Sequence, residues 1–283
     1  MAQVVSAASP RPGERLVDQF GRWGFDLDGT IWRGSTLLPC AREVVDELRR
    51  LGAQVAFLTN NGSVSASMVA HRLGEAGIRV DPAEVVTSGR AVWRLLSDRG
   101  LAGAAAYVVG GAGLKEELAP LDLALLDDES GERADVVVVT RDEDLTYARL
   151  RTASRAVAKG ALFVATNRDL RFPVEEGYWP GGGTIAAAVE AASGGVEPVV
   201  AGKPELPFLD EVRIALPGDA PAILVGDRPA SDLESAKRLG WFGALVLTGV
   251  SSGAPATTAS AHVVLGDLSE LLSVTPAGPR GSK

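Results

Sequence analysis

The chain has 283 residues, of which 46% are hydrophobic and 23% charged, so it can bury the core of one large or two medium domains. Its net charge of −8 and its pI near 5.0 argue against nonspecific binding to nucleic acid or to an anionic membrane. The single cysteine, Cys40, rules out an intramolecular disulfide, and no apolar run approaches the roughly 20 residues that span a bilayer. Residues 1–15 lack the apolar segment of a signal peptide, so we expect a cytoplasmic protein with loose tails at 1–15 and 276–283.

Segments typical of strands and helices alternate from residue 23 onward. Strands are expected at 23–27, 54–58, 85–87, 105–109, 136–140, 162–165, 199–201, 223–225 and 244–247. Helices are expected at 41–51, 65–76, 91–99, 144–159 and 184–192. A further helix, between the last two strands, is expected to begin with a capping box formed by Ser231 and Glu234. Repeated strand–helix units predict an α/β fold of parallel sheets with helices on both faces.

These strands are too many for one small sheet, which indicates two domains. Motifs typical of phosphate chemistry lie before residue 62 and after residue 200. The simplest arrangement is a core built from both ends of the chain, residues 16–99 and 198–275. A second α/β domain, residues 100–197, is then inserted between the two halves of the core.

Two aspartates, Asp26 and Asp28, lie at the end of the first predicted strand, in the segment Asp26-Leu27-Asp28-Gly29-Thr30. Residues two apart on extended chain project toward the same side, and Gly29 permits a tight turn directly afterwards. Neighbouring carboxylates repel one another unless a cation lies between them. The pair therefore suits a nucleophile, Asp26, beside an acid/base, Asp28, with a divalent metal ion joining them to a phosphate. The alternative is an ordinary acidic turn.

Three further polar segments also follow predicted strands. They are Thr59-Asn60-Asn61, Gly202-Lys203-Pro204 and Gly226-Asp227-Arg228. Ligands of open parallel sheets bind at the carboxyl ends of the strands, so these segments are expected to converge on the two aspartates. Taken alone, the first segment is more typical of a plain turn, the second of a solvated loop, and the third is ambiguous, but their residue types, order and placement agree.

The phosphate-binding part of the expected site consists of Thr59, Asn60 and Lys203. The Thr59 hydroxyl and the backbone amides near Asn60 can hold phosphate oxygens. Lys203 supplies a point charge for the non-bridging oxygens.

The metal-binding part consists of acidic residues. Asp227 is expected to complete a Mg²⁺ site with Asp26 and the backbone carbonyl of Asp28. Asp232 is expected to orient the metal ligands or the lysine from behind. Three carboxylates are balanced by Mg²⁺ and one lysine, so a phosphate dianion would not meet a net negative pocket.

The order Asp-x-Asp-Gly-Thr, Thr-Asn-Asn, Gly-Lys-Pro and Gly-Asp-Arg-x-x-x-Asp resembles that of the haloacid dehalogenase-like (HAD) phosphatases. More narrowly, the chain resembles the NagD-like, para-nitrophenyl phosphatase branch, which includes 2-phosphoglycolate, glycerol 3-phosphate and pyridoxal phosphate phosphatases. Supporting segments are 25–34, 166–169, 180–184 and 247–250, and the resemblance covers about residues 22–272. Three departures, at Gly62, Pro229-Ala230 and Ser231, remove no catalytic group.

The resemblance implies a Rossmann-like core with a large inserted α/β cap of the C2 type, dependence on Mg²⁺, and often a homodimer formed through the cap. It also implies that Asp26 is the nucleophile of an aspartyl-phosphate intermediate and that Asp28 is the acid/base.

The resemblance further points to a cap loop that sets substrate specificity, which by position is 167–183. Candidate residues in that loop are Asn167, Arg168, Asp169 and Gly182, followed by Arg171, Tyr178 and Trp179. An ordinary surface loop is the alternative. Glycerol 3-phosphate and 2-phosphoglycolate are the favoured substrates, from the resemblance alone.

Other functions remain open at this point. Gly110-Gly111-Ala112-Gly113 follows a predicted strand, with Asp127 and Asp128 further on, as in dinucleotide-binding oxidoreductases. Glu116, however, occupies the position of the third glycine, where a pyrophosphate would dock. A phosphotransferase or phosphomutase would use the same aspartyl-phosphate, and a non-catalytic phosphometabolite-binding protein would release no phosphate.

Overall fold

The computed structural model describes residues 11, 13–174, 177–249 and 261–273, and the chain divides into two compact units. Residues 1–58, 73–80 and 212–283 form the first unit, and residues 59–72 and 81–211 form the second. The predicted tail at 276–283, and most of that at 1–15, lie outside the described residues. The cap boundaries near residues 100 and 197 stay a prediction.

The first unit is built on a parallel sheet. Its strands are β1 (Arg22–Asp26), β4 (Gln54–Thr59), β13 (Ala222–Gly226), β14 (Phe242–Val246) and β15 (Val263–Leu265), in the order β15-β14-β13-β1-β4. Every pairing along this order is parallel. In the central strand, Phe25 lies opposite Val225 on one side and Phe57 on the other. All residues of β13 and β14 are buried, as expected of strands covered on both faces.

Helices and short turns complete the first unit. They are η1 (Leu16–Asp18), α1 (Ala41–Arg50), η5 (Pro229–Leu233), α8 (Glu234–Leu239) and η6 (Leu268–Leu272). The boundary between the two units falls within α2 (Ala66–Glu75). α1 buries Val44, Val45 and Leu48 on one face, because these apolar residues recur at helical spacing. A small antiparallel hairpin, β2 (Trp32–Arg33) and β3 (Thr36–Leu37), follows the first strand.

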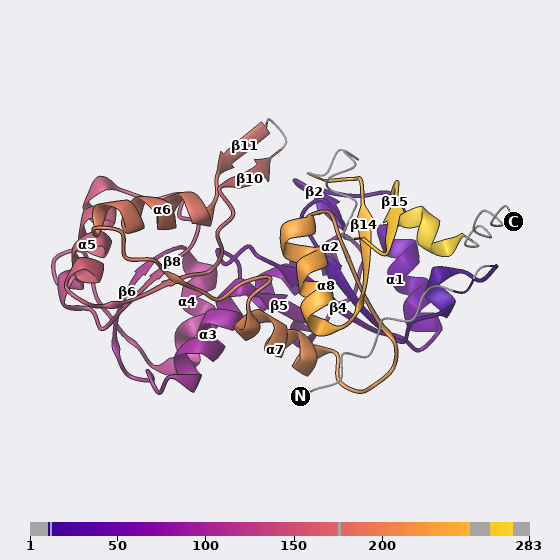
Figure 1. The fold of residues 1–283 in the computed structure, drawn as a ribbon, viewed down its shortest axis with the longest axis horizontal. Helices are drawn as coiled ribbons and strands as arrows, with labels where there is room; N and C mark the ends of the chain where they lie inside the picture. The colour runs from indigo at the N-terminus through magenta and orange to yellow at the C-terminus, as the bar shows by residue number, and fades with distance from the viewer. Residues whose placement is uncertain (1–10, 12, 175–176, 250–260, 274–283) are drawn as a thin grey trace, which may run out of the picture. The chain divides into compact units, whose positions relative to one another are not determined.

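The second unit contains a five-stranded parallel sheet. Its strands are β6 (Ala105–Val109), β7 (Ala124–Leu125), β8 (Val136–Val139), β9 (Leu162–Ala165) and β12 (Val199–Val200), in the order β12-β9-β8-β6-β7. Helices α5 (Tyr147–Ala158) and α6 (Gly182–Ala192) cover one face, and α3 (Ser88–Asp98) and α4 (Ala112–Leu118) lie on the other (Figure 1). Alternate strand residues such as Val137 and Val139 pack under α5 and α6, which is the inward half of the strand pleat. The unit also contains β5 (Val85–Thr87), the first part of α7 (Leu206–Ala215) and the 3₁₀ turns η2 (Pro82–Glu84), η3 (Ala119–Leu121) and η4 (Gly131–Arg133).

The structure confirms the predicted α/β class with parallel sheets. It adds an antiparallel hairpin, β10 (Arg171–Val174) and β11 (Gly177–Pro180), inside the segment that was expected to be a loop. Within the described ranges, no helix combines the length and the apolar character that a membrane span needs.

Candidate active site

Three buried carboxylates meet at one edge of the first unit's sheet. β1 ends at Asp26, and the neighbouring strand β13 is followed directly by Asp227. Asp232 lies in η5, and one carboxylate oxygen from each of the three aspartates lies within 4.8 Å of the others. Asp26 is 7% exposed, and Asp227 and Asp232 are fully buried. Closely spaced buried carboxylates repel one another without a cation, and hard oxygen donors are what Mg²⁺ prefers, so the donor set fits that ion.

Two glycines allow their loops to approach the Asp227 carboxylate closely. Gly29 has a φ of +99°, and a Cβ on it would lie 2.7 Å from Asp227 Oδ2. A Cβ on Gly249 would overlap the same carboxylate. Thr248 Oγ1 donates a hydrogen bond of 2.6 Å to the Gly29 carbonyl and so ties the two loops together. Only residues without a side chain fit where these loops approach the carboxylate.

The carboxylate of Asp28 has a different environment. Its Oδ1 accepts a hydrogen bond of 2.9 Å from Trp32 Nε1, and the described carboxylate cluster does not include it. Thr30 Oγ1 donates to Asp26 Oδ2 at 3.3 Å. Trp32 and Thr30 each follow their aspartate by four residues, because the turn after the strand returns the chain beside it. Their contacts with the two aspartates were missed by sequence reasoning, and this spacing is the signal that points to them.

Asp232 lies beside the metal-ligand candidates, as expected. The capping box predicted around it is wrong. Neither η5 nor α8 begins with a side-chain cap, so Ser231 and Glu234 do not form one. The helical turn already begins at Pro229, and the carboxylate of Asp232 accepts a 3.0 Å hydrogen bond from the backbone N–H of Arg228. The buried carboxylate of Asp232 therefore accepts the backbone donor that precedes this helical turn.

In the second unit, Asn60 connects several of the other predicted residues. Thr59 is the buried last residue of β4, and its Oγ1 accepts from the N–H of Asn61 at 3.0 Å. Asn60 Oδ1 accepts from the backbone N–H of Lys203 at 2.7 Å, and Asn167 Nδ2 donates to the Asn60 carbonyl at 2.7 Å. The structure thus places Thr59, Asn60, Asn167 and Lys203 in one cluster.

The remaining cap candidates have other contacts. Arg168 is 51% exposed and forms ion pairs with Glu190 at 3.3 Å and Glu197 at 3.7 Å. Gly182 begins α6, and a Cβ on it would lie 3.1 Å from the backbone nitrogen of Arg141. Its lack of a side chain serves close packing of that helix.

Trp179, on the hairpin, helps to line a cavity of about 470 Å³ in the second unit. The other lining residues are Arg141, Asp142, Glu143, Leu145, Pro180 and Ile185. The Arg141 guanidinium lies 4.2 Å from the centre of the Phe172 ring and donates to Ser63 Oγ at 3.1 Å, so its head group is held in place.

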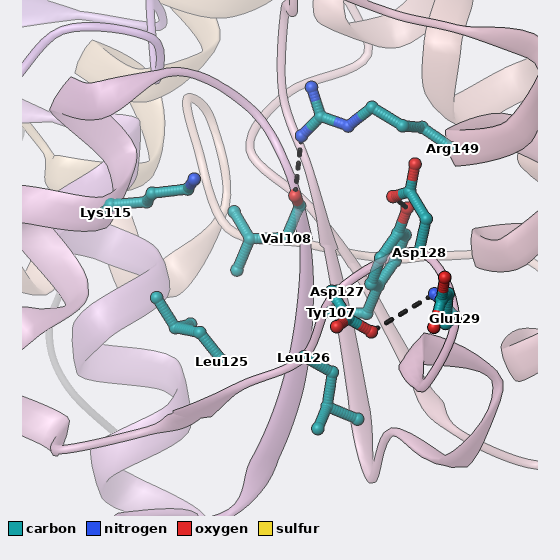
Figure 2. A pocket seen from close by; sticks show the side chains of 9 residues that line it. All are labelled: Tyr107, Val108, Lys115, Leu125, Leu126, Asp127, Asp128, Glu129 and Arg149. Carbon is teal, nitrogen blue, oxygen red and sulfur yellow. Dashed lines mark hydrogen bonds between the residues drawn. The ribbon is translucent and has the colours of Figure 1, made fainter.

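Another cavity, of about 430 Å³, lies in the second unit and is lined in part by Leu125 of the short strand β7 (Figure 2). Lys115 extends from one wall, and Arg149, Asp127 and Asp128 lie on the other. The Tyr107 hydroxyl donates to Asp128 at 2.5 Å, and burial together with this hydrogen bond raises the pKa of the phenol. None of the predicted phosphate- or metal-binding residues lines this cavity.

The glycine-rich turn before α4 does not have the form of a dinucleotide site. A Cβ on Gly113 would lie 2.6 Å from the backbone nitrogen of Ser65, so this turn packs against other backbone of the second unit. α4 itself has only 7 residues. Asp127 Oδ1, where a ribose would be expected, accepts the backbone N–H groups of Glu129 at 3.1 Å and Ser130 at 2.8 Å. Protein groups therefore take the places that the cofactor's pyrophosphate would need.

Comparison with known proteins identifies relatives of the chain. A family model for haloacid dehalogenase-like hydrolases matches residues 23–124, and a HAD-hydrolase-like model matches residues 200–271. The acid sugar phosphatase of Staphylococcus aureus (strain MRSA252) is 35% identical over 235 residues, which is 83% of this chain and 89% of that protein.

Two solved structures are similar over most of the chain. Glycerol phosphate phosphatase from Mycobacterium tuberculosis, in complex with magnesium, has a TM-score of 0.81 and 32% identity, covering 91% of this chain and 78% of that one. The p-nitrophenyl phosphatase from Archaeoglobus fulgidus has a TM-score of 0.81 and 30% identity, covering 90% of this chain and 98% of that one. The two matched family segments contain the three clustered aspartates and Lys203.

Proposed function

The chain belongs to the haloacid dehalogenase-like hydrolases and is a phosphatase, and from this premise we propose that it hydrolyses a small phosphate monoester with the help of Mg²⁺. The observation that carries the proposal is the cluster of Asp26, Asp227 and Asp232 at one edge of a parallel sheet. Two hydrogen bonds, from Thr30 and Trp32, orient the aspartates that the chemistry needs.

In the proposed reaction, Asp26 attacks phosphorus and forms an aspartyl-phosphate as the ester bond to the leaving oxygen breaks. Asp28 gives its proton to that oxygen, so that a neutral alcohol leaves. Asp28 then takes a proton from water, the water oxygen attacks phosphorus, and the bond to Asp26 breaks to release inorganic phosphate. The second step restores both carboxyl groups to their starting states.

The charge of the phosphate requires positive groups. Mg²⁺, held by Asp26, Asp227 and the backbone carbonyl of Asp28, supplies electrostatic stabilisation of the phosphate oxygens when it is bound. We assign Thr59 and Lys203 to the phosphate oxygens as hydrogen-bond donors. Lys203 is only 4% exposed, so its charge is weakly screened by water.

For the substrate we propose a short polyol or hydroxyacid phosphate, with glycerol 3-phosphate and 2-phosphoglycolate favoured. The proposal is supported by the names of the relatives, one of which is a glycerol phosphate phosphatase and another an acid sugar phosphatase. Asn167 and Asp169 are polar residues joined to the predicted phosphate-binding segment through Asn60. Such groups suit the hydroxyls of a small ester.

We also propose that the protein acts in the cytoplasm as a homodimer formed through residues 100–197. The single cysteine, Cys40, is a free thiol, which suits a reducing compartment. Leu170, Tyr178 and Trp179 are at least 50% exposed around the hairpin, which favours burial against a second copy. Light scattering after size exclusion tests the dimer, and a monomeric mass at micromolar concentration would contradict it.

The function is tested by phosphate release from a panel of esters, with Mg²⁺ and with EDTA, for wild type and Asp26→Asn. The panel contains glycerol 3-phosphate, 2-phosphoglycolate, pyridoxal phosphate, sugar phosphates, nucleotides and para-nitrophenyl phosphate. Metal-dependent release that is abolished in the variant supports the proposal and ranks the substrates. Release that survives Asp26→Asn, in a variant that unfolds at the wild-type temperature, would refute the assigned nucleophile.

A further inference from the structure

Both polar atoms of the Asn60 side chain are engaged by protein groups. Its Oδ1 accepts the backbone N–H of Lys203 at 2.7 Å, and its Nδ2 donates to the Lys203 carbonyl at 3.3 Å. Nδ2 also lies 3.3 Å from Asp169 Oδ2. The carboxamide therefore pairs with both backbone groups of Lys203, as a neighbouring strand would.

Hydrogen bonds also hold the backbone of Asn60 in place. Its carbonyl oxygen accepts two hydrogen bonds of 2.7 Å, from Ser88 Oγ and from Asn167 Nδ2. Ser88 is fully buried and Asn167 is 5% exposed, so both donors are held in the protein interior. The Asn60 side chain consequently starts from an immobilised backbone and has little freedom to move away from Lys203.

The chain around Lys203 packs too closely to shift independently of Asn60. Gly202 N–H donates to the Thr166 carbonyl at 2.8 Å, and a Cβ on Gly202 would lie 2.7 Å from Asn60 Oδ1. The Lys203 side chain is 4% exposed, and its ammonium lies 6.0 Å from the centre of the Phe208 ring. In such packing, the position of the ammonium follows the position of the backbone.

We propose that Asn60 is a positioning residue that sets the place of the Lys203 ammonium, and that its side chain is not itself a phosphate ligand. The inference rests on the proposed function, in which Lys203 meets the phosphate oxygens. The interaction of a point charge with a phosphate depends on distance, and a misplacement of about 1 Å in a catalytic group costs as much as about 100-fold in rate.

The test is a double-mutant cycle on kcat/KM for para-nitrophenyl phosphate, measured with saturating Mg²⁺. Asn60→Asp keeps an acceptor for the Lys203 N–H, but it turns the donor into an oxygen that faces the Lys203 carbonyl and Asp169. We expect a loss of about 100-fold or more for Lys203→Ala, and about 10- to 100-fold for Asn60→Asp, mainly in kcat. The double variant should lie within about 3-fold of Lys203→Ala alone, because Asn60 acts through that lysine.

Asn61→Asp provides the matched control, since it adds the same charge one residue further along. Its Oδ1 accepts from the Ser63 N–H at 3.1 Å and from the Ser63 hydroxyl at 2.6 Å, so its side chain is engaged by the residues that follow it in the loop. The effects of Asn61→Asp and Lys203→Ala should therefore multiply, unlike those of the Asn60 pair.

Multiplicative losses for Asn60→Asp and Lys203→Ala, or wild-type activity in Asn60→Asp, would overturn the inference while the phosphatase itself stands. A wild type that releases no phosphate would overturn the proposed function and this inference with it. Thermal unfolding checks that each variant folds. If Asn60→Asp does not fold, Asn60→Ser replaces it, because this change shortens the side chain without adding charge. Multiplicative losses for Asn60→Ser and Lys203→Ala would then overturn the inference in the same way.

Discussion

Replacing Gly249 by alanine should weaken Mg²⁺ binding, because the new methyl group would occupy the position of the Asp227 carboxylate. Gly249 does not have a positive φ, so the change tests space and adds no backbone strain of the left-handed region. Disturbing a group that holds a metal ligand in place typically lowers metal affinity by about 10- to 100-fold. We take about 30-fold as the working value.

That loss converts into a measurable change in stability. Mg²⁺ at 100 times the wild-type Kd stabilises the folded protein by about 2.7 kcal/mol. After a 30-fold loss of affinity the same concentration is about 3 times Kd, and the stabilisation falls to about 0.9 kcal/mol. The difference of about 1.8 kcal/mol corresponds to a Mg²⁺-induced rise in Tm that is smaller by about 4–7 °C.

Calorimetry with and without Mg²⁺ measures the effect, and the Mg²⁺ concentration for half-maximal phosphate release provides a second reading. Gly74→Ala is the control, since Gly74 lies in α2 and a Cβ there meets nothing within 4 Å. Its Mg²⁺ response should equal that of wild type, with a Tm unchanged or raised by the better helix former. A folded Gly249→Ala variant whose half-saturating Mg²⁺ stays within about twofold of wild type would refute the placement of Asp227 at the metal.

Two further predictions concern hydrogen bonds to carboxyl groups. Trp32→Phe removes the 2.9 Å hydrogen bond to Asp28 Oδ1 and keeps an aromatic ring, and such a bond is worth about 0.5–1.5 kcal/mol, so kcat should fall by about 2- to 10-fold. The fall should be larger for glycerol 3-phosphate than for para-nitrophenyl phosphate, whose leaving group needs no proton, and equal falls would contradict the role of Asp28 as acid. Burial raises the pKa of Glu117, so its contribution to stability is full below its unfolded value of about 4.3 and is lost as the pH rises through the raised value. Glu117→Gln can keep an acceptor for the Ala66 N–H and the Thr87 hydroxyl. Between pH 4 and pH 7, the free energy of unfolding in urea should therefore rise for the variant relative to wild type. A difference between the two free energies that does not change with pH would count against the raised pKa.

The strand framework was largely predictable, because buried parallel strands are continuous apolar runs with clear ends. The predicted strands 85–87, 105–109 and 162–165 agree with the structure at both ends. Helix starts were harder to locate. The helix expected from residue 144 begins at Tyr147, because Thr146 is its N-cap and accepts the N–H of Arg149 at 3.2 Å. The hairpin at 171–180 was missed because Pro173 interrupts the pattern of a strand.

The motifs were readable from the sequence because each follows a strand, but the expectation that all four follow strands of one sheet is wrong: β12, which precedes Lys203, belongs to the second unit's sheet. The partners of individual side chains were not readable. Asn60 meets Asp169 and Lys203 across 109 and 143 residues of sequence, and no local pattern encodes such a pairing. Trp32 appears in the sequence as an ordinary core aromatic, and only the turn at Gly29 brings its indole N–H to Asp28.

The sheet of the first unit also sets an order of events during synthesis. β1 pairs with β13 through residues such as Phe25 and Val225, which are 225 − 25 = 200 positions apart. At a translation rate of about 5–20 residues per second, β1 waits about 10–40 s on the ribosome before that neighbour emerges. The second unit is mostly contiguous and is complete by residue 211, so it can fold during that wait. The unit that contains Lys203 can thus fold first, and Asp26 gains Asp227 as a neighbour only near the end of translation.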